Sequence, residues 1–129
     1  MSAHSTVGVE IRAIAILIKS IIDLGVEYKK LSKMRTEDGK IHDVELIVKD
    51  ANGKDIGFEK TDSGDYRIIS DSTGLNKAQL KKQADLIKQI KQRYSYNTVI
   101  DKLKKDGYII AQEEKVNNNT IRLVARKWG

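Results

Sequence analysis

Residues 76–94, with the sequence NKAQLKKQADLIKQIKQRY, contain the pattern that decides most about the fold. Apolar side chains recur along this stretch at helical spacing, namely Leu80, Ala84, Ile87, Ile90 and Tyr94. Residues with this period fall on one side of an α-helix, and asparagine is a frequent cap of helix N-termini. The sequence therefore predicts a long amphipathic helix that begins after Asn76.

The apolar spacing changes phase after Tyr94 and does not continue regularly toward Gly107. A change of phase is typical of a kink, or of a second helix that starts anew. We expect this break at residues 95–98, with Ser95 or Asn97 as a new cap, and the end of the second piece at Gly107. This helix is thus predicted to be long, basic and kinked.

Alternation of apolar and polar residues predicts β-strands on both sides of this helix. The alternating segments are residues 7–11, 44–48, 56–58, 66–70, 108–114 and 120–128. Asn52-Gly53 and the turn residues 62–65 connect three of them as antiparallel hairpins, and residues 117–119 suit a hairpin between the last two. The polar segment 31–40 is predicted to be a loop.

An apolar segment at residues 13–24 predicts a first, shorter helix that stops at Gly25. Ile16 lies on the polar side of this helix and is a candidate anchor for a partner. The order of elements predicts an α+β fold in which two helices pack on one face of a mainly antiparallel sheet. The length of 129 residues, without a visible linker, predicts a single domain over residues 1–129.

Composition restricts the classes of function. The chain has no cysteine, which excludes disulfides and thiolate chemistry and fits a reducing compartment. Its two histidines, His4 and His42, lack the spacing that presents two imidazoles to one metal, and we expect surface or capping roles for them. No phosphate-loop, dinucleotide-binding or nucleophile-elbow motif occurs. We therefore expect no catalytic residues, no metal and no cofactor.

The N-terminal region gives no sign of membrane insertion or export. The apolar run at residues 13–18 is far shorter than the roughly 20 apolar residues that span a bilayer. The residues before it lack the basic segment of a signal peptide. The sequence predicts a soluble, cytoplasmic protein without membrane association.

Positive charge is concentrated in one segment. Residues 77–105 contain nine basic and two acidic residues, for a net charge of +7, while the whole chain carries +6. All other residues together therefore carry only −1. Such a one-sided distribution indicates a role in solubility, or contact with a polyanion or an acidic partner.

The basic segment and the C-terminus supply the candidate binding residues. These candidates are Lys77, Lys81, Lys88, Lys91, Arg93, Tyr96 and Trp128. Because catalytic motifs are absent, we favour a non-enzymatic protein that binds an unidentified protein partner or a second copy of itself. The alternative is a nucleic-acid-binding protein in which this helix contacts phosphates.

A third interpretation of the lysines involves no ligand at all. Lysine stems can cover apolar surface while their ammonium groups remain in water. Lysines outnumber arginines eight to one between residues 77 and 105, whereas base readout and bidentate phosphate contact favour arginine. A simple solvated helix face therefore explains the same residues.

The chain also resembles a known family over most of its length. The segments that carry the resemblance are residues 2–24, 55–58, 92–99 (QRYSYNTV), Gly107-Tyr108, Glu113-Glu114 and 121–124, together with Arg126 and Trp128. They are similar to the hypothetical chloroplast open reading frame thirty-five family of plastids, cyanobacteria and other bacteria. That family has no assigned function, so the resemblance implies a small soluble accessory protein without known catalytic residues. It also implies the plastid stroma as the compartment of a plastid-encoded member.

Overall fold

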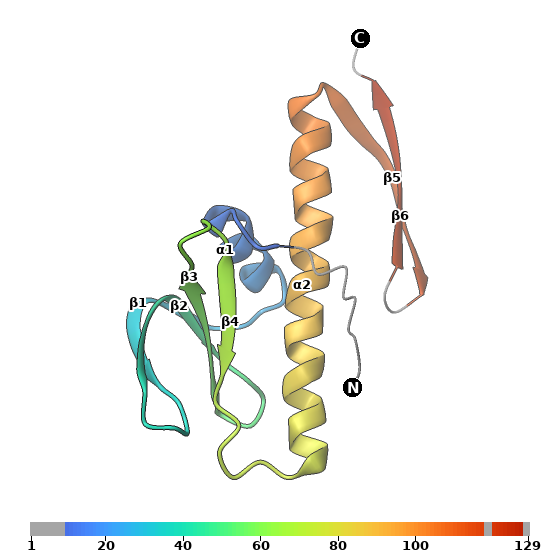
Figure 1. The fold of residues 1–129 in the computed structure, drawn as a ribbon. Helices are drawn as coiled ribbons and strands as arrows, with labels where there is room; N and C mark the ends of the chain where they lie inside the picture. The colour runs from blue at the N-terminus through green and yellow to red at the C-terminus, as the bar shows by residue number, and fades with distance from the viewer. Residues whose placement is uncertain (1–9, 118–119, 128–129) are drawn as a thin grey trace, which may run out of the picture.

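The computed structural model describes residues 10–117 and 120–127 (Figure 1). In chain order the elements are α1 (Ile14–Asp23), β1 (Tyr28–Arg35), β2 (Ile41–Lys49), β3 (Asp55–Lys60), β4 (Tyr66–Ser70), α2 (Lys77–Lys105), β5 (Tyr108–Asn117) and β6 (Thr120–Lys127). This arrangement confirms the predicted α+β class. Residues 7–9 of the first expected strand lie outside the described residues, and Ile11 forms an isolated bridge with Tyr66 of β4.

Strands β1 to β4 form an antiparallel sheet in the order of the sequence. Leu46 of β2 pairs with Phe58 of β3, and Gly57 of β3 pairs with Ile69 of β4. The predicted turn at Asn52-Gly53 is confirmed, and Gly53 has a φ of 77°, a conformation that glycine adopts without strain.

The prediction of a loop over residues 31–40 was wrong. Strand β1 pairs with β2 from Tyr28, opposite Val48, to Arg35, opposite Ile41. β1 is an edge strand of the sheet, and three of its eight residues are lysines. Lysine on an edge strand hinders pairing with other chains, and it also removes the apolar alternation by which strands are recognised. Only residues 36–40 form the connecting turn.

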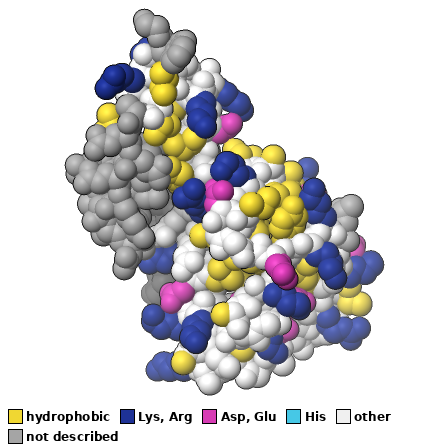
Figure 2. All heavy atoms as spheres, turned by 180° about the vertical axis from the view of Figure 1, so that it is seen from behind, with side chains coloured by type: hydrophobic (Ala, Val, Ile, Leu, Met, Phe, Trp, Pro, Cys, Tyr) yellow, Lys and Arg dark blue, Asp and Glu magenta, His cyan; other side chains and the backbone are white. Residues whose placement is uncertain are grey.

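Both helices cover one face of this sheet, as predicted. The shared core contains Leu17 and Ile21 of α1, Ile90 and Tyr94 of α2, and four strand residues, Leu46, Val48, Ile56 and Phe58. Ile16 packs against this core, so it does not project from the helix as a free anchor. Figure 2 shows hydrophobic side chains gathered over α1 on the back of the molecule, and Ile22 is 57% exposed.

A smaller apolar cluster lies elsewhere on the sheet. Met34, Val44 and Ile47 are buried in it, and Ile69 packs against them. Gly57 lies beneath this cluster, where an added Cβ atom would stand 2.8 Å from both Met34 Sδ and Val44 Cγ1. A glycine at this position therefore lets the two side chains pack directly on the backbone of β3.

Helix α2 is continuous from Lys77 to Lys105, and Figure 1 shows it as a straight rod. The predicted break at residues 95–98 was therefore wrong. The hydroxyl groups of Ser95 and Thr98 donate to the carbonyl oxygens one turn earlier, at 3.0 and 2.8 Å, and do not cap a new helix. The apolar phase changes because the two halves of α2 have different neighbours.

Strands β5 and β6 form the predicted antiparallel hairpin, with Asn117 opposite Thr120. Within the described residues this hairpin is a separate two-stranded sheet, beside the C-terminal half of α2 (Figure 1). At its base, Lys127 Nζ donates to the carbonyl oxygen of Asp106 at 3.1 Å and lies 4.9 Å from the centre of the Tyr108 ring. The strands thus divide into two sheets.

Candidate interaction surface

Local sequence signals fix both ends of α2. The Asn76 side chain accepts a hydrogen bond from the Gln79 backbone nitrogen, and Gln79 Oε1 accepts one from the Asn76 backbone nitrogen, both at 2.9 Å. This reciprocal capping box satisfies two N–H groups that the helix leaves unpaired. At the other end Gly107, with a φ of 86°, allows the chain to leave the helix.

Hydrogen bonds hold the C-terminal half of α2 against α1 and the residues just before it. The Tyr94 hydroxyl oxygen accepts hydrogen bonds from the backbone nitrogens of Arg12 and Ala13, both at 3.0 Å. Three residues further along, Asn97 Nδ2 donates to Ser20 Oγ and to Asp23 Oδ2, also at 3.0 Å. These contacts fix the rotation of α2 about its own axis and therefore decide which side chains face outward.

The N-terminal half of α2 is held by the buried side chain of Gln83. Its Nε2 donates to Asp50 Oδ2 at 3.0 Å and to the Asp71 carbonyl oxygen at 2.8 Å, and its Oε1 accepts from Ser72 Oγ at 2.9 Å. Gln83 thus occupies an inward position of the helix. Burial of an amide is tolerated here because its hydrogen-bonding groups have partners.

The inward face of α2 therefore differs from the predicted one. The buried residues are Gln83, Ile90, Tyr94 and Asn97, so only Ile90 and Tyr94 of the predicted stripe are buried. Leu80 is 42% exposed, and Ala84 is exposed as well. The apolar stripe is rotated toward the edge of the contact between helix and sheet.

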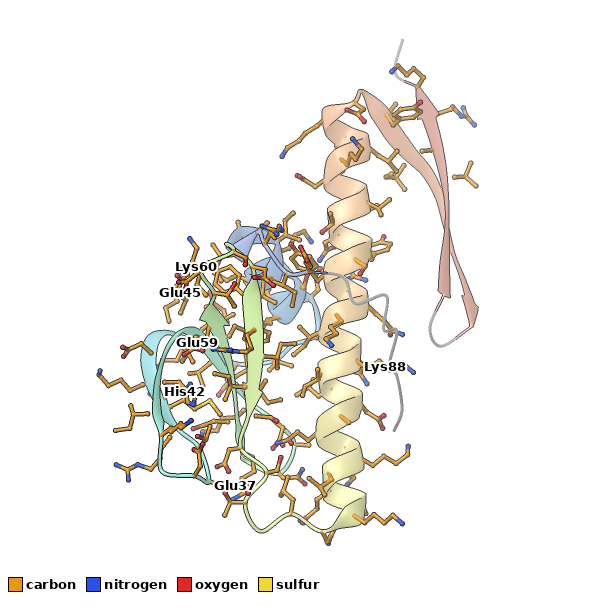
Figure 3. All side chains as sticks on the ribbon, in the orientation of Figure 1. Glu37, His42, Glu45, Glu59, Lys60 and Lys88 are labelled. Atoms are coloured by element: carbon orange, nitrogen blue, oxygen red, sulfur yellow. The ribbon has the colours of Figure 1, made fainter. Side chains whose placement is uncertain are left out.

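Four exposed lysines, Lys77, Lys81, Lys88 and Lys91, form what we call the basic flank. At 3.6 residues per turn they lie within about 80° of one another around the helix axis. Figure 3 shows Lys88 pointing away from the four-stranded sheet. Lys81 forms an exposed ion pair with Asp85 at 3.5 Å, a kind of contact that holds a lysine only weakly.

Arg93 and Tyr96 do not lie on the basic flank. Arg93 Nε donates to Asp23 Oδ2 at 3.1 Å, and its guanidinium lies 4.5 Å from the centre of the Tyr96 ring. Arg93 therefore joins the two helices and is occupied within the molecule. Trp128, the remaining candidate, lies outside the described residues, as does His4.

The carboxyl group of Asp23 is the centre of this contact between the helices. Desolvation raises its pKa, but hydrogen bonds from Asn97, Lys19 and Arg93 together outweigh that effect. The pKa of Asp23 consequently lies below its ordinary value. Folding thus stabilises the ionised carboxylate of Asp23, which accepts hydrogen bonds from Arg93 and Asn97 of α2 and so joins the two helices.

His42 lies on β2 of the four-stranded sheet, whereas the basic flank, with Lys88, lies on α2 (Figure 3). Its Nδ1 is 3.2 Å from Glu59 Oε2, and the other Glu59 oxygen accepts a hydrogen bond from Arg67. The Arg67 hydrogen bond is the main reason why the pKa of Glu59 is lowered, in spite of desolvation. Among the side chains that the structure describes, no three His, Asp or Glu are grouped as a metal would require.

An open groove of about 550 Å³ lies along another side of α2. Its wall contains Lys82 and Asp85 of the helix, Glu27 of the connection after α1, and Lys49 and Asp50 at the end of β2. Lys49 is already paired with Asp55 at 2.6 Å. The groove thus mixes both signs of charge and gives no preference for one class of ligand.

Neither helix in the described part of the chain is long and apolar enough to cross a membrane.

Comparison with known proteins agrees with the resemblance found in the sequence. Residues 20–124 match the model of a family described as "Protein of unknown function (DUF1257)". The chain belongs to this family. It is 29% identical over 90 residues to "Uncharacterized protein ycf35" of Cyanophora paradoxa, covering 70% of this chain and 68% of that protein.

A second relative covers nearly the whole chain. The identity to "Uncharacterized protein ycf35" of Pyropia yezoensis is 24% over 133 aligned positions, which cover 99% of this chain and 98% of that protein. No solved structure matches the chain. These family relationships carry no assigned activity, so function has to be inferred from the surface itself.

Proposed function

We propose that this protein is a non-enzymatic interaction protein that binds an acidic protein partner through the basic flank of α2. The observation that carries the proposal is a contrast among its basic residues. Among the described residues, the ion pairs of α2 involve Lys81, Arg93, Lys102 and Lys105, and none involves Lys77, Lys88 or Lys91. Four other basic side chains of the two helices are paired, namely Lys19 and Arg93 with Asp23, Lys105 with Asp101 and Lys102 with Asp106. Lys82 and Lys104 also form no ion pair with a described residue, but at 3.6 residues per turn they lie on other sides of α2 and do not extend the row.

The electrostatics of the flank support an acidic ligand. Like charges close together on one helix repel one another, and an opposite charge on a partner removes that repulsion. From Lys77 to Lys91 the flank extends about 21 Å at 1.5 Å per residue. A row of this length is suited to an elongated partner rather than to a single small anion.

Nucleic acid is the alternative ligand, because phosphates also satisfy a row of cations. Base stacking would require an aromatic side chain on the same surface. The nearby aromatic Tyr96 stacks with Arg93 on another side of the helix. This placement favours a protein over a nucleic acid.

We expect the complex to form in the cytoplasm, or in the plastid stroma of an organism that encodes the protein there.

Affinity capture from native extract tests the proposal when three forms of the protein are compared. The double variant Lys81→Glu/Lys88→Glu reverses two charges of the flank, and Lys82→Glu makes the same kind of change in the groove. We expect a partner that survives nuclease treatment, is lost with the double variant and is retained by Lys82→Glu. Equal capture by all three forms contradicts the proposal, and loss of all capture after nuclease treatment identifies nucleic acid as the ligand.

A further inference from the structure

Beside the basic flank, α2 carries an apolar stripe that the core leaves partly uncovered. Leu80 is 42% exposed, Ala84 is exposed, and Ile87 is half-buried. Their spacing of four and three residues places them in one row along the helix. The row is uncovered because Gln83 occupies the inward position and is held there by Asp50 and Ser72.

The stripe and the basic flank are adjacent on the same helix. At 3.6 residues per turn, Ala84 lies between Ile87 on the core side and Lys88 on the solvent side. The surface thus has an apolar edge of about two turns, from Leu80 to Ile87, beside a cationic row of about four turns, from Lys77 to Lys91. A nucleic acid would use the cationic edge alone, whereas a protein segment with two matching edges would use both.

We propose that the partner inserts an amphipathic α-helix along this surface. Its apolar edge packs on Leu80, Ala84 and Ile87, and its acidic edge faces the basic flank. This inference rests on the proposed function and adds the structural class of the ligand. Packed helices approach to about 8–10 Å between axes, and the small side chain of Ala84 permits that approach at the centre of the stripe. An apolar face bound in this way is a recurrent mode of peptide recognition.

The charge pattern specifies the ligand further. The lysines of the flank are separated by four, seven and three residues, the spacing of positions that share one side of a helix. A facing helix with carboxylates at the same spacing, i, i+4, i+11 and i+14, meets them along the whole row. The ligand is therefore a helix of roughly four turns, about 14 residues, with aspartate or glutamate along one edge and leucine-like residues along the next.

A synthetic peptide provides the direct test. The probe is an amphipathic helix of about 18 residues with leucines in one row and glutamates in the adjacent row, titrated by fluorescence anisotropy at low salt. We expect saturable binding that Leu80→Gln and Lys88→Glu each weaken about tenfold. The matched controls are Ile22→Gln, an exposed apolar residue of α1, and Lys82→Glu, and neither should change the affinity. Circular dichroism verifies that each variant keeps its helix content and its Tm.

A second peptide separates failure of this inference from failure of the proposed function. It has the same sequence except that two central residues are replaced by proline, which prevents helix formation. If it binds as tightly as the helical probe, or if Leu80→Gln has no effect while Lys88→Glu weakens binding, the helical ligand is refuted and the acidic partner stands. If neither peptide binds, or if Lys81→Glu/Lys88→Glu leaves binding unchanged, the proposed function is refuted as well.

Discussion

The hydroxyl oxygen of Tyr94 lies 3.0 Å from the backbone nitrogen of Ala13 and accepts its hydrogen bond. Ala13 is the residue before the first turn of α1, and α1 has no side-chain cap of its own. A residue in the middle of α2 thus performs the capping function for α1 across the tertiary contact. The two helices are coupled at the point where the orientation of the basic flank is decided.

Replacement of Tyr94 by phenylalanine tests this coupling. The ring keeps its place in the core, but the backbone N–H groups of Arg12 and Ala13 lose their acceptor. We expect a loss of about 1–3 kcal/mol in the free energy of unfolding, measured by urea denaturation. The control is Tyr28→Phe, at a half-exposed position of β1, which should change stability by less than about 0.5 kcal/mol. Equal effects of the two variants would contradict the capping role.

The lowered pKa of Asp23 predicts a dependence of stability on pH. Because its pKa is lower in the folded than in the unfolded protein, its stabilising contribution is complete above the ordinary carboxyl pKa of about 4. The contribution is lost as the pH falls through the lower, folded value. We expect a decrease in the free energy of unfolding between roughly pH 5 and pH 3. The decrease should be smaller in Asp23→Asn, and an unchanged slope in this variant would remove Asp23 as a cause.

The close packing over Gly57 predicts a coupled pair of substitutions. Gly57→Ala introduces a Cβ atom 2.8 Å from Val44 Cγ1, where ordinary packing does not allow it. We expect a loss of about 1–3 kcal/mol in stability. Val44→Ala removes one of the two atoms in the way, and Met34 Sδ, the other, belongs to a flexible side chain that can shift. The double variant should therefore be more stable than the sum of the two single effects predicts. Strict additivity in a double-mutant cycle would show that the strain lies elsewhere.

The sequence predicted the parts of the fold whose signals are local. The capping residue Asn76, the turn at Asn52-Gly53 and the alternation of β2 each determine their own segment. β1 was missed because it is an edge strand whose side chains are mostly exposed, and only Met34 among its described side chains is buried. An edge position is a property of the assembled sheet and leaves little pattern in the strand itself.

The candidate surface was predicted in part for a similar reason. The lysines of the flank are where helical periodicity places them. The same periodicity puts Arg93 and Tyr96 on another side of the helix, but the ion pair of Arg93 with Asp23, 70 residues away in the chain, has no local signal. Gln83 and Asn97 were missed because polar residues are expected outside. The sequence does contain a pattern for the inward face of α2, because Gln83, Ile90 and Asn97 recur every seventh position. This pattern can be recognised only if hydrogen-bonded polar residues are accepted as part of the core.

The affinity of the acidic helical peptide as a function of ionic strength tests the central claim most directly. The account predicts that affinity falls as salt rises, that Lys81→Glu/Lys88→Glu abolishes most of the binding at low salt, and that Lys82→Glu does not. An affinity that is independent of salt and equal in the wild type and the double variant would contradict it.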